Sequence, residues 1–178
     1  MITRLCRNVS LTLYGIIYNL KVFKMRENIK EIIVGALEEC ALPELHISSL
    51  NVRVDTGAKT SSLHVDNIEP EDRGDELWVS FDIHPDIHNV ARVVRRAAKV
   101  KGKRGIISSN ASKEKRFVIE TTICMGTQSW PIEVTLTDRS GMSYLMLLGR
   151  EAMLDRFIVN PSKEYLLGQS ETQLSSHG

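Results

Sequence analysis

The chain has 178 residues, of which 42% are hydrophobic and 25% charged, and its formal net charge is +1. These values predict one soluble globular domain with a substantial core, and they argue against a two-lobed enzyme or a globally disordered chain. The charge is unevenly spread, because residues 92–104 hold seven cations and no acid, which leaves −6 (+1 minus +7) for the remaining residues.

The N-terminal part, residues 1–24, is predicted to be a dispensable extension. Its uncharged run from Asn8 to Leu20 has 13 residues, whereas a membrane-spanning helix needs about 17–25. No signal-peptide cleavage site follows the run, and Met25 opens a sequence typical of a cytosolic protein. A membrane-surface anchor is the alternative for this extension. We expect the folded domain over residues 25–170 and a disordered tail over residues 171–178.

The three cysteines, Cys6, Cys40 and Cys124, are odd in number and lack paired spacing. This pattern argues against a disulfide framework and favours free thiols in a reducing compartment, most simply as small buried side chains. We therefore predict a cytoplasmic protein with no membrane partner.

The first segment of the domain, residues 29–42, has helix-like apolar spacing but contains Gly35, and periodicity alone cannot separate a helix from strands there. Alternation of apolar and polar residues is much clearer further along the chain. It predicts strands at residues 50–54, 63–65, 77–83, 117–125 and 130–136, the last two forming a hairpin.

Residues 89–112, between two of these strands, are predicted to be a long basic connection that contains Gly and Ser. After the hairpin, a short apolar run ends at Gly149, and we expect a short helix over residues 150–157 and a last strand over residues 165–167. The pattern as a whole predicts an all-β domain, a compact barrel or sandwich of about seven strands with one short helix near its end.

The segment with the clearest chemical meaning is Asp55-Thr56-Gly57, which directly follows the strand at residues 50–54. A turn of small residues lets the backbone approach a ligand or a symmetry-related chain closely, because Gly57 can adopt a positive φ. Thr56 can hydrogen-bond within the turn and hold Asp55 in one rotamer. The alternative is an Asx turn that only closes a hairpin.

Four longer stretches carry a family resemblance: Asp55–His64, Arg116–Thr121, Leu136–Ser140 and Met146–Arg150. Asp-Thr-Gly-Ala after an apolar strand, with Leu-Leu-Gly-Arg about ninety residues later, resembles the retroviral-type aspartic proteases. The full strings are closer to the bacterial family named for ATP-dependent zinc proteases, which is also described as retropepsin-like and is linked to ATP-grasp glutamate ligases. The resemblance covers residues 32–167 and implies an acid-protease-like fold, a closed barrel of six or seven strands with one short C-terminal helix.

Aspartic proteolysis needs two carboxylates that share one proton, one acting as a base on water and the other as an acid toward the scissile bond. The chain has one Asp-Thr-Gly, and the segment Asp138–Gly141 is a poor second copy because it inserts a residue and a cation. The resemblance therefore implies a homodimer in which Asp55 from each of two chains forms the catalytic pair.

Other residues are expected to shape the turn or to bind substrate. They are Thr56, Gly57, Ala58, Lys59, His64, Arg95, Arg96, Leu148, Gly149 and Arg150. Leu148 and Gly149 would support the turn, and a structural role is the alternative for His64. Lys59 stands where retroviral enzymes carry an acid, and a cation there would oppose proton sharing between the two carboxylates.

The basic strip at residues 92–104 falls where a retropepsin-like layout would place a flap over the substrate. With Lys59, Arg139 and Arg150 it would favour an acidic or polyglutamylated peptide, in keeping with the family's link to glutamate ligases. A solvated loop is the alternative. No aromatic residue interleaves with these cations, so no nucleic-acid partner is expected.

Neither zinc nor ATP finds support in the sequence. His84 and His88 have the spacing of a metalloprotease helix, but Pro85 stands where the catalytic Glu belongs, and the pair follows a strand. A glycine-rich phosphate loop is also missing. We therefore expect no metal and no cofactor.

The sequence thus predicts a homodimeric aspartic peptidase that hydrolyses a peptide or isopeptide bond, with Asp55 as the catalytic residue. One alternative is a non-catalytic module of the same fold that binds an acidic peptide or a partner protein. Another is a monomeric enzyme that pairs Asp55 with a different acid, such as Asp138.

Overall fold

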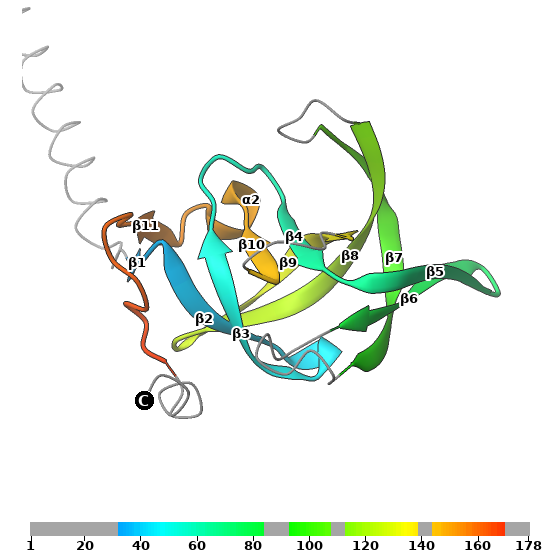
Figure 1. Ribbon diagram of the computed structural model, residues 1–178, viewed down its shortest axis with the longest axis horizontal. Coiled ribbons are helices and arrows are strands. Elements are labelled where there is room, and N and C mark those ends of the chain that lie inside the picture. Colours follow the sequence, from blue (N-terminus) through cyan, green and yellow to red (C-terminus); the bar gives the residue numbers. More distant parts are fainter. Residues whose placement is uncertain (1–31, 84–92, 108–112, 139–143, 170–178) are drawn as a thin grey trace, which may run out of the picture. The chain divides into compact units, whose positions relative to one another are not determined.

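The computed structural model describes residues 32–83, 93–107, 113–138 and 144–169. The predicted N-terminal extension, the histidine pair at residues 84–88 and the C-terminal tail lie outside these residues. Strands make up most of the described chain, together with one α-helix and one short 3-10 helix (Figure 1). The prediction of an all-β domain with one short helix is therefore confirmed. Among the described residues, no helix is both long enough and apolar enough to span a membrane.

The strands of the described chain mostly alternate apolar and polar residues, so that every second side chain is turned toward the core. In chain order the elements are β1 Ile32–Val34, β2 Leu37–Leu42, η1 Pro43–Leu45, β3 Ile47–Val54, β4 Ser61–His64, β5 Asp66–Arg73, β6 Glu76–Ile83, β7 Val94–Ile107, β8 Lys113–Met125, β9 Gln128–Thr137, β10 Met146–Leu148, α2 Arg150–Met153 and β11 Phe157–Val159.

Nine strands form one sheet in the order β2-β3-β10-β4-β9-β8-β7-β6-β5, and β1 pairs separately with β11. Strands β3 and β4 are consecutive in sequence, yet β10 lies between them, parallel to β3 and antiparallel to β4. The turn that joins β3 to β4 therefore passes the end of β10. This topology brings residues 55–60 next to residues 148–150.

Strand β2 also pairs with β8, through Ala41 and Cys124. Pairings therefore run in a ring through β2, β3, β10, β4, β9 and β8 and back to β2. Buried apolar side chains from these strands and from β6 pack together in a core cluster. Its most deeply buried members include Leu42, Leu63, Phe81, Ile119, Ile123, Leu136, Met146 and Leu148.

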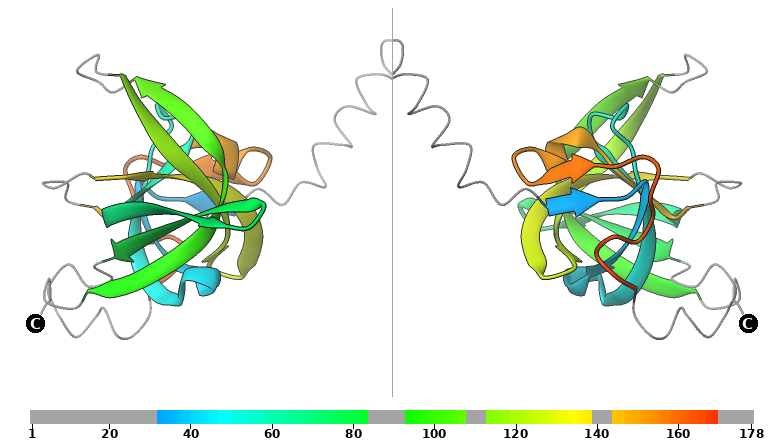
Figure 2. Two further views of the ribbon diagram at one scale, coloured as in Figure 1. Left: turned by 90° about the vertical axis from the view of Figure 1, so that its right-hand side faces the viewer. Right: turned by 90° about the vertical axis from the view of Figure 1, so that its left-hand side faces the viewer.

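The prediction of a basic connection over residues 89–112 is wrong for most of these residues. Residues 94–107 form β7, a strand of 14 residues that pairs with β6 on one side and β8 on the other. Figure 2 shows β7 and β8 side by side as a long twisted hairpin. The segment is a strand because its exposed cations alternate with half-buried residues and meet carboxylates on neighbouring strands.

Several shorter predictions also change. The ambiguous N-terminal segment consists of two strands, β1 and β2, on either side of Gly35. The helix predicted over residues 150–157 is shorter than expected and ends at Met153. Phe157, its predicted last residue, instead begins the strand β11. Strand β5 is not predicted from the sequence, since it is largely polar and contains Pro70.

The last strand predicted, residues 165–167, is irregular chain rather than a strand. It is held by the carboxylate of Glu38, which is fully buried and accepts hydrogen bonds from the N–H groups of Leu166 and Leu167 at 3.0 and 3.2 Å. The same carboxylate accepts a bond of 2.6 Å from the N–H of Gly35. One buried side chain therefore replaces a strand partner for this segment.

Candidate active site

The candidate site is the turn formed by residues 55–60, between the end of β3 and the start of β4. The N–H of Asp55 donates to the carbonyl of Leu148 at 3.0 Å, which extends the β3–β10 pairing by one residue. Asp55 is half-buried, whereas Thr56 and Gly57 are exposed. The turn thus presents a carboxylate at the surface from the end of a paired strand.

The carboxylate of Asp55 is fixed by the backbone of its own turn. Its Oδ1 accepts hydrogen bonds from the N–H of Gly57 at 2.9 Å and of Ala58 at 3.1 Å. A β-carbon on residue 57 would lie 3.1 Å from this oxygen, closer than nine in ten such contacts in proteins. The positive φ expected for Gly57 from the sequence is wrong. Gly57 instead lets the turn close tightly on the carboxylate because it has no side chain.

Gly149 allows the end of β10 to touch the far side of the turn. A β-carbon on this residue would lie 2.5 Å from the carbonyl carbon of Thr60 and 2.8 Å from the nitrogen of Ser61. The N–H of Gly149 donates to the hydroxyl of Ser61 at 3.1 Å. Leu148 is fully buried beside Val54, so both predicted support residues do contact the turn or its strand.

Arg150 braces the turn from its other side. Its Nη1 donates to the carbonyls of Thr56 and Gly57, each at 2.8 Å, and its backbone N–H donates to the carbonyl of Ala58 at 2.9 Å. The guanidinium is therefore engaged by the turn itself. Its placement favours a positioning role over the direct substrate contact predicted from the sequence.

Lys59 and Glu151 form an exposed ion pair beside the turn, with Nζ 3.5 Å from Oε1. The backbone N–H of Glu151 also donates to the carbonyl of Lys59 at 3.0 Å. The carboxylate of Glu151 partly neutralises the positive charge of Lys59. Lys59 therefore opposes proton sharing between two carboxylates less than an unpaired cation would.

Arg104 also contacts the Asp55 turn, and this contact is not predicted from the sequence. One of its guanidinium nitrogens donates to the hydroxyl of Thr60 at 2.6 Å and to Glu151 at 3.1 Å, and the other donates to Glu133 at 2.7 Å. These bonds tie the β7–β8 hairpin to the Asp55 turn. The sequence shows Arg104 only as one member of a basic strip, because the contact joins residues 44 positions apart.

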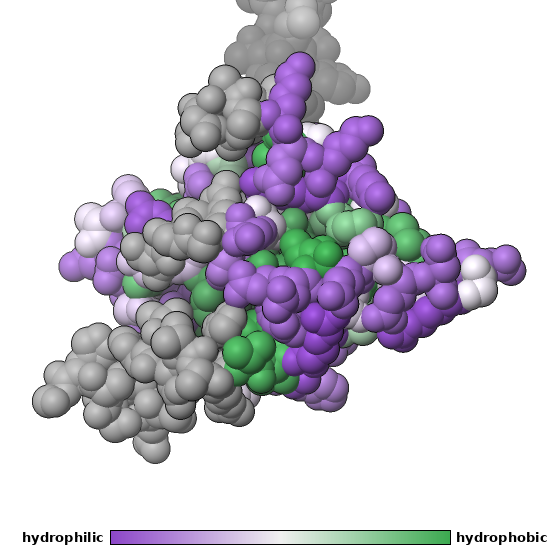
Figure 3. Space-filling view, turned by 45° about the vertical axis from the view of Figure 1, so that its right-hand side comes forward, coloured by the Kyte–Doolittle hydropathy of each residue, from purple (hydrophilic) through white to green (hydrophobic). Residues whose placement is uncertain are grey.

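The other described cations of the strip are mostly paired with acids on neighbouring strands. Arg95 pairs with Glu69 and Asp82, and Lys101 bonds to Glu120 and Glu133. These hydrogen bonds raise the pKa of Lys101 above its usual value. On the face in Figure 3, hydrophilic residues cover most of the described surface, with hydrophobic ones showing near its middle.

Arg95 and Arg96 lie at the start of β7, far along the strand from Arg104. Arg104 follows Arg95 by nine positions, or roughly 30 Å at about 3.3 Å per residue. The guanidinium of Arg96 donates to the carbonyl of Leu45 at 2.7 Å. The structure therefore does not bring these two predicted substrate-binding residues to the turn.

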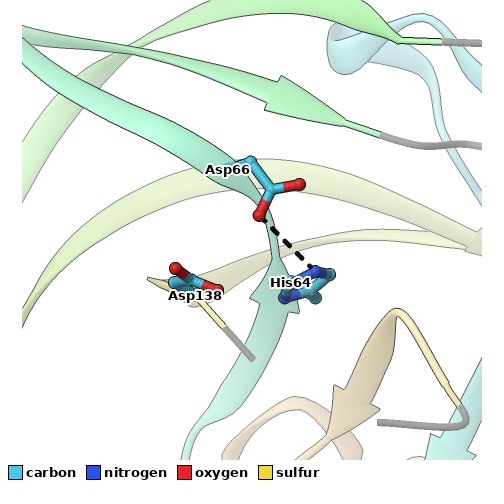
Figure 4. Close-up of side chains that lie close together, drawn as sticks. All are labelled: His64, Asp66 and Asp138. Atoms are coloured by element: carbon cyan, nitrogen blue, oxygen red, sulfur yellow. Dashed lines mark ion pairs between the residues drawn. The ribbon is translucent and has the colours of Figure 1, made fainter. Parts of the chain in front are cut away.

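His64 lies at the end of β4 away from the Asp55 turn. Ser61 begins this strand next to the turn, and three residues of strand span roughly 10 Å. The imidazole Nε2 of His64 is 3.8 Å from Oδ1 of Asp66, and Asp138 lies close to both (Figure 4). Asp138 is therefore grouped with His64, which argues against its pairing with Asp55 in one chain.

An Asp-Thr-Gly turn, braced by a strand inserted between the two strands that it joins, places this chain among the retropepsin-like proteins. Residues 33–170 match the sequence profile of the family described as "Retropepsin-like aspartic endopeptidase RimB". The chain belongs to this RimB-like family. The family resemblance predicted from the four sequence stretches is thus confirmed.

Similar curated proteins carry the name "Probable alpha-L-glutamate ligase". The chain is 47% identical over 138 residues to the one from Shewanella pealeana, which matches 77% of the chain and 30% of that protein. It is 45% identical over 145 residues to the one from Desulfotalea psychrophila, matching 82% of the chain and 31% of that protein. The chain therefore spans about three tenths of the length of these relatives.

A solved structure has the same fold. It is a Legionella pneumophila protein described as of unknown function, with a TM-score of 0.64 and 28% identity over 76% of this chain and 98% of that one. The fold described above is therefore one that nearly the whole of that protein adopts.

Proposed function

We propose that this chain is an aspartic peptidase that works as a homodimer, with Asp55 from each chain forming the catalytic pair. The observation that carries the proposal is the Asp55 turn, which holds a half-buried carboxylate with two backbone N–H donors at an exposed surface. Proton-sharing catalysis needs two carboxylates within a few ångströms. A two-fold axis beside the turn would supply the second from an identical chain.

In the proposed reaction one carboxylate takes a proton from water, and the resulting nucleophile attacks the carbonyl carbon of the scissile amide. The protonated carboxyl of the other chain stabilises the developing oxyanion. A proton then passes to the leaving nitrogen, so that the products are a carboxylic acid and an amine. Arg150 and Gly149 act as positioning residues, because they hold the turn without facing the substrate.

The scaffold for this site would be a closed barrel of six strands. The pairing of Ala41 with Cys124 supports closure, since it completes the ring of strands that begins and ends with β2. The β7–β8 hairpin would act as the flap over the substrate. Its connection to the turn through Arg104 and Thr60 supports this role.

We further propose that the substrate is a peptide or isopeptide bond in a glutamate-rich chain. Support comes from the relatives named as α-L-glutamate ligases, in which a region similar to this chain occupies about three tenths of the length. A peptidase beside such a ligase would hydrolyse the kind of bond that the ligase forms. The free thiols of Cys40 and Cys124 are consistent with a cytoplasmic protein.

The test is hydrolysis of a synthetic peptide that ends in a tail of α-linked glutamates, followed by mass spectrometry. We expect the wild-type chain to shorten the tail and Asp55→Asn to lose this activity by at least about a thousandfold, as for catalytic residues elsewhere. The Asn side chain retains an oxygen that can accept from Gly57 and Ala58, so the turn keeps its shape. Asp75→Asn, an exposed change in the β5–β6 turn, is the matched control.

Two outcomes would contradict the proposal. Hydrolysis that persists in Asp55→Asn would assign the chemistry to another residue. Binding of the peptide by the wild type, with no hydrolysis at any protein concentration, would instead support the non-catalytic module.

A further inference from the structure

A second group of chemically active side chains lies at the other end of β4. His64 ends β4, Asp66 begins β5, and Asp138 directly follows β9. One ligand atom from each of the three lies within 4.8 Å of the other two. Figure 4 shows the three side chains around a common space.

The sheet fixes two of these residues next to each other. Strands β4 and β9 are parallel neighbours, and His64 is directly opposite Thr137, the residue before Asp138. The N–H of His64 donates to the carbonyl of Leu145 at 2.7 Å, and the N–H of Val65 donates to the carbonyl of Thr137 at 3.1 Å. The bond from Val65 to Thr137 therefore holds the chain at His64 against the chain at Asp138, and the bond to Leu145 fixes the other side of His64.

A local irregularity in β5 directs the third residue toward them. The register of β5 against β6 shifts between Asp66 and Glu69, and Asn67 has a φ of 49° in the left-handed region. Bulges of this kind bend a strand and redirect its side chains, and they are common beside functional sites. The side chain of Asn67 is itself used by a 2.7 Å hydrogen bond to Asp82.

The donor set has the composition of a metal centre. One imidazole and two carboxylates are ligands that suit Zn²⁺ and similar divalent transition metals, and three protein ligands leave a position open for water or substrate. Zinc bonds to nitrogen and oxygen of about 2.0–2.2 Å would bring the donors to roughly 3–3.5 Å from one another. The donor atoms here lie within 4.8 Å of one another. Side-chain rotations that move them by little more than about 1 Å would bring them to the separations that zinc requires.

Burial also suits a site that exchanges with solvent. The side chain of His64 is 14% exposed and that of Asp66 is 34% exposed, while Asp138 is exposed. A cation could enter from the Asp138 side, and the half-buried imidazole would form the inner wall. Two carboxylates that converge on one point gain from a divalent cation between them.

We propose that His64, Asp66 and Asp138 form a binding site for a divalent transition-metal cation, with Zn²⁺ as the preferred ion. The site is separate from the Asp55 turn and does not depend on the function proposed for that turn. The expected absence of metal rested on the spacing of histidines along the sequence. The spacing of histidines cannot reveal this donor set, because residues 64 and 138 are brought together only by the parallel pairing of β4 with β9.

The test uses the full chain, freed of metal with a chelator and titrated with ZnCl₂ by calorimetry. We expect one Zn²⁺ per chain, and X-ray absorption should show one imidazole nitrogen and carboxylate oxygens around the ion, with no sulfur. Asp138→Asn and His64→Gln should each weaken binding by at least about tenfold, as changes around metal ligands commonly do. Because Asp138 is exposed, its substitution should leave the fold intact, which circular dichroism would verify.

Two control variants are matched to these changes. His46→Gln and Asp75→Asn replace exposed residues of the same types elsewhere in the chain and should leave Zn²⁺ binding unchanged. Binding that Asp138→Asn leaves intact but that His84→Gln or His88→Gln abolishes would overturn the proposal, as would sulfur ligands to the ion. Absence of binding up to millimolar Zn²⁺ would show that the cluster is only an ion pair.

Discussion

Replacing Gly149 with alanine tests directly how the Asp55 turn is held. The backbone of Gly149 is extended, with φ −81° and ψ 167°, so alanine adopts it without conformational strain. The obstacle is space, because the new β-carbon would lie 2.5 Å from the carbonyl carbon of Thr60 and 2.8 Å from its oxygen. Ordinary contacts begin at 3.4 Å, so β10 and the turn must separate by roughly 1 Å.

We expect this separation to lower the free energy of unfolding by about 3 kcal/mol, at the upper end of the range for overpacking, since both obstructing atoms belong to the backbone. Gly105→Ala is the matched control. A β-carbon at that position in β7 meets nothing within 4 Å, so this change should be neutral or stabilise the protein by up to about 1 kcal/mol.

The assay is urea unfolding followed by tryptophan fluorescence at one protein concentration. Trp130 is a suitable probe, because it is buried and its indole N–H donates to the carbonyl of Ala152 in α2 at 2.9 Å. If Gly149→Ala and Gly105→Ala differ by less than about 0.5 kcal/mol, the close packing of β10 against the turn is not what supports it.

Three further predictions concern the rest of the domain. Glu38→Ala should lower the free energy of unfolding by about 2–4 kcal/mol, because it leaves one buried and two partly buried backbone N–H groups without their acceptor; chemical denaturation measures this loss. Burial raises the pKa of the Cys40 thiol, so iodoacetamide should label Cys124 first in the native protein and Cys40 only after unfolding, as mass spectrometry can resolve. The hydrogen bond from Lys101 lowers the pKa of Glu133 below 4.5 in the folded state. The ionised Glu133 side chain therefore stabilises the folded protein fully above pH 4.5, and this stabilisation is lost as the pH falls through the pKa of Glu133 in the folded state. Glu133→Gln should therefore destabilise the protein more at pH 6 than at pH 3, and an equal effect at both pH values would contradict this assignment.

The sequence was most informative where alternation and turn chemistry act locally. The β8–β9 hairpin and the strand before Asp55 follow from apolar residues at every second position, and the supporting roles of Leu148 and Gly149 follow from the family resemblance. Each of these features depends on a short stretch of chain with a strong pattern.

Features that depend on distant partners were not predictable in the same way. Strand β7 is not predictable from its own residues, because its cations are stabilised by acids on other strands, such as Glu133. The contact of Arg104 with the turn and the grouping of His64 with Asp138 both depend on strand order, and a single sequence does not specify that order. Physical complementarity across the sheet, rather than local propensity, decides these cases.

The most direct test of the central claim is the activity of mixed dimers. Wild-type chains at constant concentration are incubated with increasing amounts of Asp55→Asn, and hydrolysis of the glutamate-tailed peptide is followed after exchange. If the catalytic pair combines Asp55 of both chains, each mixed dimer has lost one carboxylate, so activity should fall steadily toward zero as the variant is added in excess. Activity that stays constant under the same excess would show that a single chain carries the complete site and would contradict the account.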